Sequence, residues 1–263
     1  MTTRRRALAA YLFPPLAVAA AFFVIPLAEL ARQSFSGGLA SYARFFGDSY
    51  YLSALVITLG NAVLVTMVTI VVSYPLAFTY WQAGPRRRSL LVILLLSPFY
   101  ANVVVKVFGW MVLLPAGLRE GYWAILLIDV HRAMPFMVLM LAAALARIEP
   151  EVMESARMCG ASPSRVIRTV VLPLSMPGVV GGGILVFSLT LASFIVPLLV
   201  GGAVGGRFLA VLMYHQITIA QDWGFGAAIG VVLLATASLA IAVGNRVVRG
   251  ARLGRVMGDG FGG

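Results

Sequence analysis

Three ionisable side chains stand within apolar stretches of this chain, where a charge can act on a solute or on another charge. Asp129 and Arg132 are three residues apart, so an α-helix places them on one face and within reach of each other. Lys106 lies in the preceding apolar stretch, just before Trp110. Because a charge among apolar groups is costly unless it meets a partner or water, we predict a structural ion pair between Asp129 and Arg132. The alternatives are that all three side chains line a path for a solute, or that Lys106 extends to the nearer polar surface.

The sequence holds none of the usual residue patterns for catalysis, nucleotide binding or metal binding. It has no Gly-x-x-x-x-Gly-Lys-Ser/Thr loop for phosphate groups, and no Ser/His/Asp, Cys/His or paired-carboxylate constellation. Its single cysteine, Cys159, and its two histidines, His131 and His215, show no spacing of metal ligands. We therefore predict that the chain is not an enzyme and has no catalytic residue, metal or cofactor of its own. Any energy for moving a solute must then come from another subunit.

Composition places the chain among proteins that cross a membrane several times. Hydrophobic residues make up 61% and charged residues 11% of its 263 residues, and its mean hydropathy is +0.97. Because a helix needs about 20 apolar residues to cross a bilayer, the chain has room for about six spans joined by short loops. The net charge of +11 does not indicate a nucleic-acid partner, since the arginines gather at the ends of the apolar stretches.

The apolar stretches predict an all-α polytopic membrane protein with six transmembrane helices. These helices are expected near 8–30, 53–80, 90–114, 123–146, 176–200 and 225–246. The chain then divides into an N-terminal part, 1–52, a core with spans two to six, 53–246, and a basic, glycine-rich tail, 247–263. We predict that this tail is disordered from Gly250 onward.

The positions of the arginines predict which loops face the cytoplasm. On one side the loops carry Arg4 to Arg6, Arg86 to Arg88, the arginines between 147 and 168, and the tail arginines from Arg246 onward. The loops on the other side carry only isolated arginines. Because cytoplasmic loops are enriched in basic residues, both termini are predicted to be cytoplasmic, with 31–52 and 201–222 on the opposite side.

A polar loop, 148–175, lies between the fourth and fifth predicted spans and carries helix signals on both sides of a glycine. Pro150 suits the first turn of a helix, and Gly160 can end that helix in a left-handed conformation. Pro163, preceded by a serine, is typical of the start of a second short helix, which we expect to end near residue 171. We predict a helix–glycine–helix elbow on the cytoplasmic face, with a shape suited to docking into a partner. A loop on the membrane surface with no partner is the alternative.

The elbow contains Glu154, Ser155, Ala156, Gly160, Ala161, Ile167, Leu172 and Pro173. This pattern resembles the EAA loop of the permease subunits of binding-protein-dependent ABC importers. In that family the loop reads Glu-Ala-Ala, three residues, Gly, about nine residues and then Ile-x-Leu-Pro. Ser155 here replaces the first Ala, and Val170 stands where the family often has Ile, which are conservative changes. The resemblance implies that these eight residues couple the chain to an ATPase.

Further motifs occur across most of the chain. They read Tyr-Pro-Leu-Ala at 74–77, Ser-Pro-Phe at 97–99, Pro-Phe-Met-Val-Leu at 135–139, Leu-Pro-Leu-Ser-Met-Pro-Gly at 172–178, Phe-Ile-Val-Pro-Leu-Leu-Val-Gly-Gly at 194–202 and Trp-Gly-Phe-Gly-Ala-Ala at 223–228. They resemble the spermidine/putrescine-type permeases, and the motif at 194–202 is closer to the first of that family's two paired permeases. The region 116–133 departs from the pattern. Since relatives of this group are associated with polyamines, opines, phosphonates, thiamine, sulfate and ferric iron, the resemblance does not identify the solute.

The resemblance implies the type I ABC importer permease fold, with 148–175 as its coupling-helix loop, in the bacterial inner membrane. It implies that the chain pairs with a second permease, as a heterodimer, and forms half of the translocation pathway for a small charged solute, polyamine-like solutes being the nearest. Two ATPase subunits would hold ATP and Mg²⁺, and a periplasmic binding protein would deliver the solute. A non-transporting assembly or receptor subunit and an export permease are the alternative functions.

Overall fold

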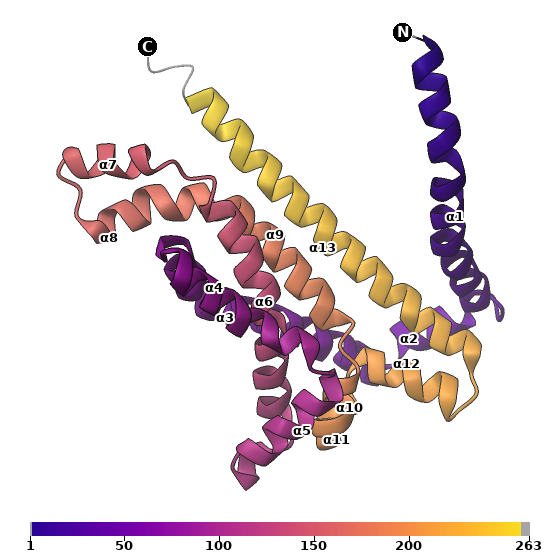
Figure 1. Cartoon of the computed structure of the whole chain (residues 1–263). Coiled ribbons are helices and arrows are strands. Elements are labelled where there is room, and N and C mark those ends of the chain that lie inside the picture. Colours follow the sequence, from indigo (N-terminus) through magenta and orange to yellow (C-terminus); the bar gives the residue numbers. More distant parts are fainter. Residues whose placement is uncertain (1, 259–263) are drawn as a thin grey trace. The chain divides into compact units, whose positions relative to one another are not determined.

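The computed structural model describes residues 2–258, and all the regular structure in this part of the chain is helical (Figure 1). The N-terminal half contains α1 (Thr2–Ser34), α2 (Ala40–Gly47), α3 (Ser49–Gln82), α4 (Pro85–Tyr100), α5 (Val103–Leu113), η1 (Ala116–Leu118) and α6 (Tyr122–Leu145). The C-terminal half contains α7 (Pro150–Met158), α8 (Pro163–Val166), η2 (Ile167–Val171), α9 (Leu172–Leu191), α10 (Ile195–Val200), α11 (Gly202–Gly205), α12 (Leu209–Thr218) and α13 (Trp223–Gly258). The predicted all-α class is confirmed.

Five helices in the described part of the chain are long and apolar enough to cross a membrane. They are Phe13–Ser34, Ser49–Gln82, Tyr122–Leu145, Pro163–Leu191 and Trp223–Arg246. These helices correspond to the first, second, fourth, fifth and sixth predicted spans, because each contains one long apolar stretch that favours a continuous helix in hydrocarbon.

The third predicted span, 90–114, is wrong as a continuous helix. The structure has two helices there, because α4 ends at Tyr100 and α5 begins at Val103. The side chain of Asn102 accepts a hydrogen bond from the backbone N–H of Val104 at 2.9 Å, and this N-cap stabilises a new helix start. Only single polar residues interrupt the apolar stretch at this point, which is why mean hydropathy alone does not reveal the break.

The fifth predicted span, 176–200, is wrong at both ends. The helix begins within the polar loop, at Pro163, and ends at Leu191. Residues 192–194 are not helical, and α10 follows them. The segment 201–222 contains α11 and α12. Because α13 continues to Gly258, the prediction of disorder is wrong for residues 250–258. The rest of the predicted disordered tail, 259–263, lies outside the described residues.

The chain forms two compact units, one of which combines Met1–Leu52 with Leu212–Val232. Within this unit, Arg44 of α2 pairs with Asp222 at 3.2 Å, and its guanidinium carbon lies 4.1 Å from the centre of the Phe225 ring. Asp222 also accepts a hydrogen bond from the backbone N–H of Phe225 at 3.0 Å, which caps the start of α13. These contacts attach α2 to the first turn of α13.

The second unit combines Ser53–Val211 with Leu233–Gly263 and is built around α6 and α9. Two glycines of α9 allow these helices to approach closely. A Cβ atom at Gly178 would overlap the Cβ of Ala144, and one at Gly182 would lie 2.6 Å from the sulfur of Met137. Small residues four apart are a common way to pack helices in a membrane, where no hydrophobic force draws them together.

Candidate functional site

The elbow turns at Gly160 through a pair of backbone hydrogen bonds. Gly160 has a φ of 78°, in the left-handed region that the sequence predicts for it. Its N–H donates to the carbonyl of Arg157 at 2.9 Å, and the N–H of Ala161 donates to the carbonyl of Ala156 at 3.2 Å. Together these bonds form a Schellman turn, which satisfies carbonyl groups at the end of α7. The chain thereby reverses, and α7 and α8 lie side by side (Figure 1).

The second arm of the elbow begins at Pro163, as predicted, but it does not end near residue 171. It passes through the π-helical turn η2 and continues as α9 to Leu191 without a break. The Ser162 side chain makes no capping hydrogen bond to the backbone of α8, and its hydroxyl instead forms a hydrogen bond with the hydroxyl of Ser164 at 3.2 Å. The second arm of the elbow is therefore the first part of the fifth membrane-spanning helix and not a separate short helix.

The predicted coupling residues divide into an inner and an outer set. Ala156 and Ala161 pack against a buried cluster that includes Ile148, Val166 and Val171, so they fix the elbow to the helices beneath it. Ile167 and Pro173 are also half-buried. Glu154, Ser155, Gly160 and Leu172 are exposed. The exposed set forms the surface that a partner can reach.

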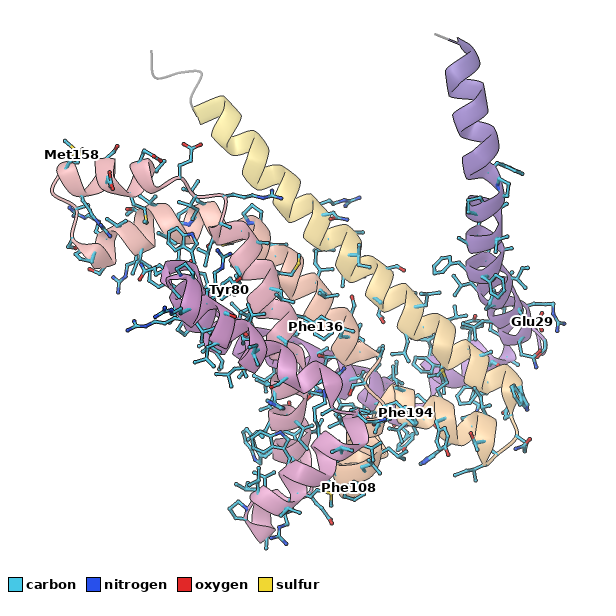
Figure 2. All side chains as sticks on the ribbon, in the orientation of Figure 1. Glu29, Tyr80, Phe108, Phe136, Met158 and Phe194 are labelled. Atoms are coloured by element: carbon cyan, nitrogen blue, oxygen red, sulfur yellow. The ribbon has the colours of Figure 1, made fainter. Side chains whose placement is uncertain are left out.

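Sequence reasoning missed the most exposed apolar side chain of this surface, Met158. It is 89% exposed at the tip of α7 and points away from the other helices (Figure 2). The signal that could have singled it out is its place two residues before Gly160, at the end of the first predicted arm of the elbow. An exposed methionine adapts its shape to an apolar surface, and this suits a contact with a partner.

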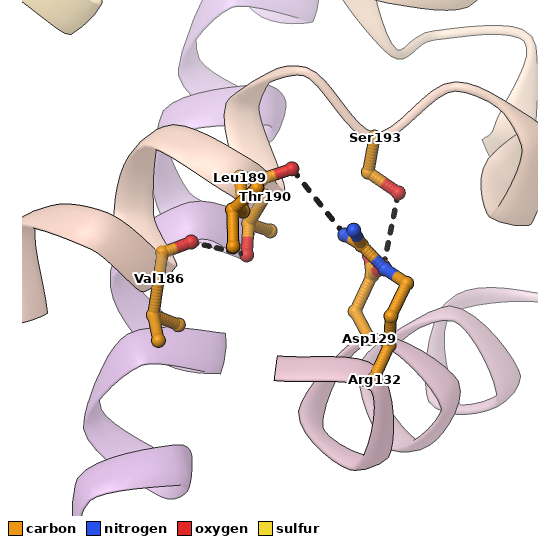
Figure 3. A network of polar contacts seen from close by, with 6 residues as sticks. All are labelled: Asp129, Arg132, Val186, Leu189, Thr190 and Ser193. Carbon is orange, nitrogen blue, oxygen red and sulfur yellow. Dashed lines mark hydrogen bonds and ion pairs between the residues drawn. The ribbon is translucent and has the colours of Figure 1, made fainter. Parts of the chain in front are cut away.

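The predicted ion pair between Asp129 and Arg132 is present within α6. Arg132 Nη2 lies 2.9 Å from Asp129 Oδ1, and the Ser193 hydroxyl donates to the same oxygen at 2.9 Å (Figure 3). The Asp129 side chain is fully buried, whereas that of Arg132 is 19% exposed. Asp129 thus connects α6 to the non-helical residues after α9.

Arg132 explains how α9 can end inside the bundle. Its Nη2 group also donates to the carbonyl of Leu189 at 3.3 Å. Leu189 lies in the last turn of α9, where carbonyl groups have no partner within the helix. Arg132 supplies one of these carbonyl groups with a donor, and the Ser193 hydroxyl holds the residues after the helix against Asp129, at the point where α9 ends at Leu191 rather than at the predicted residue 200. The pair therefore lies at the junction between α6 and the end of α9.

Lys106 lies near the start of α5, with a partly exposed side chain, and its charge is close enough to interact with that of Arg132. Lys106 is thus placed in the same region as Asp129 and Arg132. Sequence reasoning missed a fourth member, His131, whose Nδ1 accepts a hydrogen bond from Trp110 Nε1 at 3.2 Å. These two residues are far apart in sequence, and no local signal predicts their contact.

Comparison with known proteins gives one matching family model. The model described as "Binding-protein-dependent transport system inner membrane component" matches residues 86–252. This range includes the elbow and the ion pair of α6.

Several curated proteins are similar to the chain over most of its length. The spermidine/putrescine transport system permease protein PotB of Salmonella typhimurium (strain SL1344) is 28% identical over 80% of this chain and 79% of its own length. The inner membrane ABC transporter permease protein YdcU of Escherichia coli (strain K12) is 31% identical over 68% of this chain and 66% of its own length. PotC of Haemophilus influenzae is 28% identical over 69% of this chain and 75% of its own length.

Two solved structures share the fold. A chain of a bacterial alginate ABC transporter, solved with an alginate-bound periplasmic protein, superposes with a TM-score of 0.76 at 16% identity and covers 94% of this chain and 95% of that one. A chain of the MetNI methionine ABC transporter in an inward-facing conformation superposes with a TM-score of 0.63 at 22% identity, covering 78% of this chain and 99% of that one. The type I importer permease fold predicted from the sequence is confirmed.

Proposed function

Because the chain belongs to the family of inner membrane components of binding-protein-dependent transport systems, we propose that it is the permease subunit of an ATP-driven importer. It forms half of a pathway for a small charged solute and performs no catalysis itself. ATP and Mg²⁺ are held by a partner subunit. The observation that carries this proposal is the continuous helix from Pro163 to Leu191, which joins an exposed elbow to the middle of the bundle.

This helix gives a route by which ATP hydrolysis can act on the pathway. The ATPase contacts the outer surface of the elbow at Glu154, Ser155 and Met158. A helix is stiff along its axis, so displacement of the elbow moves α9 as one body. The far end of α9 meets Arg132 through the carbonyl of Leu189, so the same displacement reaches the charged side chains of the spans. The bundle alternates between two packed states as the ATPase closes and opens.

The complete importer contains four further subunits. A second permease, different from this chain, forms the other half of the pathway. Support for this comes from PotB and PotC, two permease proteins of one named transport system that are both similar to this chain. Two ATPase subunits bind the elbows from the cytoplasm, and a periplasmic binding protein delivers the solute. The names of these relatives make spermidine and putrescine the first solutes to test.

The importer function predicts that a binding protein stimulates ATP hydrolysis. We expect the chain to co-purify with its ATPase and second permease, and ATP hydrolysis by this complex in proteoliposomes to rise when the binding protein is added. The measurement is the rate of phosphate release with and without the binding protein, and it requires no knowledge of the solute. An equal rate of phosphate release with and without the binding protein would favour an export permease. Failure of the ATPase to co-purify would favour an assembly or receptor subunit.

Cysteine labelling tests the orientation on which this proposal depends. In a Cys159→Ser background, we expect a membrane-impermeant thiol reagent to label Ser41→Cys and Arg207→Cys in intact cells and to spare Ser89→Cys until the cells are opened. The physical reason is that arginine-rich loops stay in the cytoplasm during insertion. The reverse labelling pattern would place the elbow outside the cell, where no cytoplasmic ATPase could reach it.

A further inference from the structure

A groove with a volume of about 570 Å³ opens on the second compact unit, where residues of α6, α7, α9 and α13 line it. Its walls are mainly apolar. They include Met140 of α6, Val152 of α7 and Leu174 of α9, whose side chains are 37%, 40% and 38% exposed. Large apolar side chains that gather around one hollow and stay exposed indicate that an apolar group covers them.

The groove has about the length of one leaflet of a bilayer. Leu174 and Ile184 both line it, and a helical rise of about 1.5 Å per residue places them about 15 Å apart along α9. The hydrocarbon of a bilayer is about 30 Å thick, so one leaflet supplies about half of this thickness. A Cβ atom at Gly244 of α13 would overlap the Ile184 side chain, so α13 touches α9 at this end of the groove. The dimensions match one acyl chain.

The other end of the groove, where α6 stops, carries two opposite charges. Arg147 and Glu149 line the groove from the turn between α6 and α7, and both side chains are exposed. Within residues 2–258, neither side chain forms a hydrogen bond or an ion pair, and the two do not pair with each other. The guanidinium group carries donors and the carboxylate carries acceptors, so this end suits a ligand with both an anion and a cation.

The combination of an apolar groove with these two charges favours a phospholipid over a protein chain as the occupant. A protein that covered the groove would have to supply an acid and a base at the spacing of Arg147 and Glu149, because a buried charge without a partner is costly. A zwitterionic phospholipid carries a phosphate, an ammonium group and an acyl chain in one molecule. Since α6 and α9 are long and apolar enough to span a membrane, such lipids surround the groove.

We propose that the groove binds a phospholipid whose headgroup carries a phosphate and a primary ammonium, as in phosphatidylethanolamine. One acyl chain lies along α6 and α9, the phosphate accepts hydrogen bonds from Arg147, and the ammonium group donates to Glu149. The bound lipid packs between α7 of the elbow and the spans beneath it, since Val152 and Leu174 line the same groove. This site goes beyond the transport function and requires only that the chain spans a bilayer.

Photo-crosslinking of the full-length chain in lipid nanodiscs tests this site. The nanodiscs consist of phosphatidylcholine, whose quaternary ammonium has no N–H group, with a small fraction of phosphatidylethanolamine that carries a diazirine at the end of one acyl chain. We expect illumination to attach the probe to residues of the groove, located by peptide mass spectrometry, and the labelling to saturate with probe concentration. Unlabelled phosphatidylethanolamine should compete about tenfold better than phosphatidylglycerol, because the latter lacks the ammonium group that donates to Glu149.

Two charge variants test the headgroup contacts. Arg147→Gln should weaken labelling of the groove about tenfold, because it removes the charged donor to the phosphate. Arg168→Gln is the matched control, since Arg168 is also exposed on the elbow but does not line the groove. We expect this control to bind the probe as the parent chain does. Glu149→Gln should abolish the preference for phosphatidylethanolamine over phosphatidylglycerol.

A third variant tests the groove without changing a charge. Ala143 lines the groove and is exposed, so Ala143→Leu should fill part of the groove and reduce labelling, whereas Ala242→Leu enlarges an exposed alanine outside the groove and should not. Labelling that does not saturate, equal competition by the two lipids in the parent chain, or equal binding by Arg147→Gln and Arg168→Gln would each overturn the inference. Labelling that disappears when the second permease is added to the nanodisc would assign the groove to a protein interface instead. None of these outcomes changes the expected stimulation of ATP hydrolysis by the binding protein, so the proposed function is tested separately.

Discussion

Valine in place of Gly160 is expected to uncouple ATP hydrolysis from transport while the chain still folds in the membrane. Gly160 has a φ of 78°, and the left-handed conformation costs an L-residue about 1–2 kcal/mol, with β-branched residues among the least tolerant. A Cβ atom at this position would meet no atom within 4 Å, so the cost comes from the backbone and not from packing. A strain of this size lowers the population of the closed turn by about 5- to 30-fold, and α7 loses its position beside α8.

The measurement is ATP hydrolysis stimulated by the binding protein, together with recovery of the ATPase in co-purification. Gly84→Val is a matched control, because Gly84 also stands in a predicted cytoplasmic loop and has open space around it, but its φ is −66°. We expect this control to behave as the parent protein. Gly160→Asn should retain partial coupling, because asparagine tolerates the left-handed region better than valine does. Normal coupling by a well-expressed Gly160→Val variant would contradict the assigned role of the elbow.

Local signals were sufficient to predict the elbow, and the reason is physical. A left-handed residue after a helix is most readily glycine, and a proline is compatible with the first turn of a helix, so Gly160 and Pro163 fix the turn by their own conformational limits. The continuation of the second arm through η2 into α9 was not predictable in this way. A helix that stays helical across a polar-to-apolar boundary leaves no stop signal in the sequence.

The ends of the helices inside the membrane depend on contacts between distant segments. At the end of α9, Arg132 donates to the carbonyl of Leu189, and the Ser193 hydroxyl holds the following residues against Asp129. Arg132 is 57 residues from Leu189, and no local pattern connects them. The break before α5 has a local cause, the N-cap at Asn102, but an isolated asparagine in an apolar stretch is a weak signal. The Asp129–Arg132 pair was predictable because its spacing of three is a property of one helix.

Removing either partner of the Asp129–Arg132 pair is expected to destabilise the chain, and the two single variants should differ. Breaking a buried ion pair costs about 3–5 kcal/mol, because one charge is left without a partner. Arg132→Gln leaves the carboxylate of Asp129, which is fully buried, whereas Asp129→Asn leaves a guanidinium group that is 19% exposed. We therefore expect Arg132→Gln to lower the thermal unfolding midpoint in detergent more than Asp129→Asn does.

The double variant Asp129→Asn with Arg132→Gln should recover part of the loss, because it leaves no uncompensated charge. Glu29 and Arg32 provide a matched control, since they form an ion pair with the same spacing of three but are 57% and 69% exposed. Glu29→Gln should change the unfolding midpoint little, because this pair lies in the last turns of α1 and is not enclosed by packed helices. Comparing the unfolding midpoints of the Asp129 and Glu29 variants thus separates the cost of leaving a buried charge without a partner from the cost of losing a salt bridge as such.

A double-mutant cycle on the thermal data decides whether the two residues act together, because coupled residues deviate from additivity by about 0.5–3 kcal/mol and independent residues do not. Additive effects would mean that the contact between Asp129 and Arg132 contributes nothing, and Asp129 would then be free to serve a cationic solute. The same variants in the complete transporter give a second, independent readout. If the double variant is stable and its ATP hydrolysis still responds to the binding protein, but it no longer carries solute, the pair lines the path. If uptake instead returns in proportion to stability, Asp129 and Arg132 act by holding the end of α9 against α6, and other residues recognise the solute.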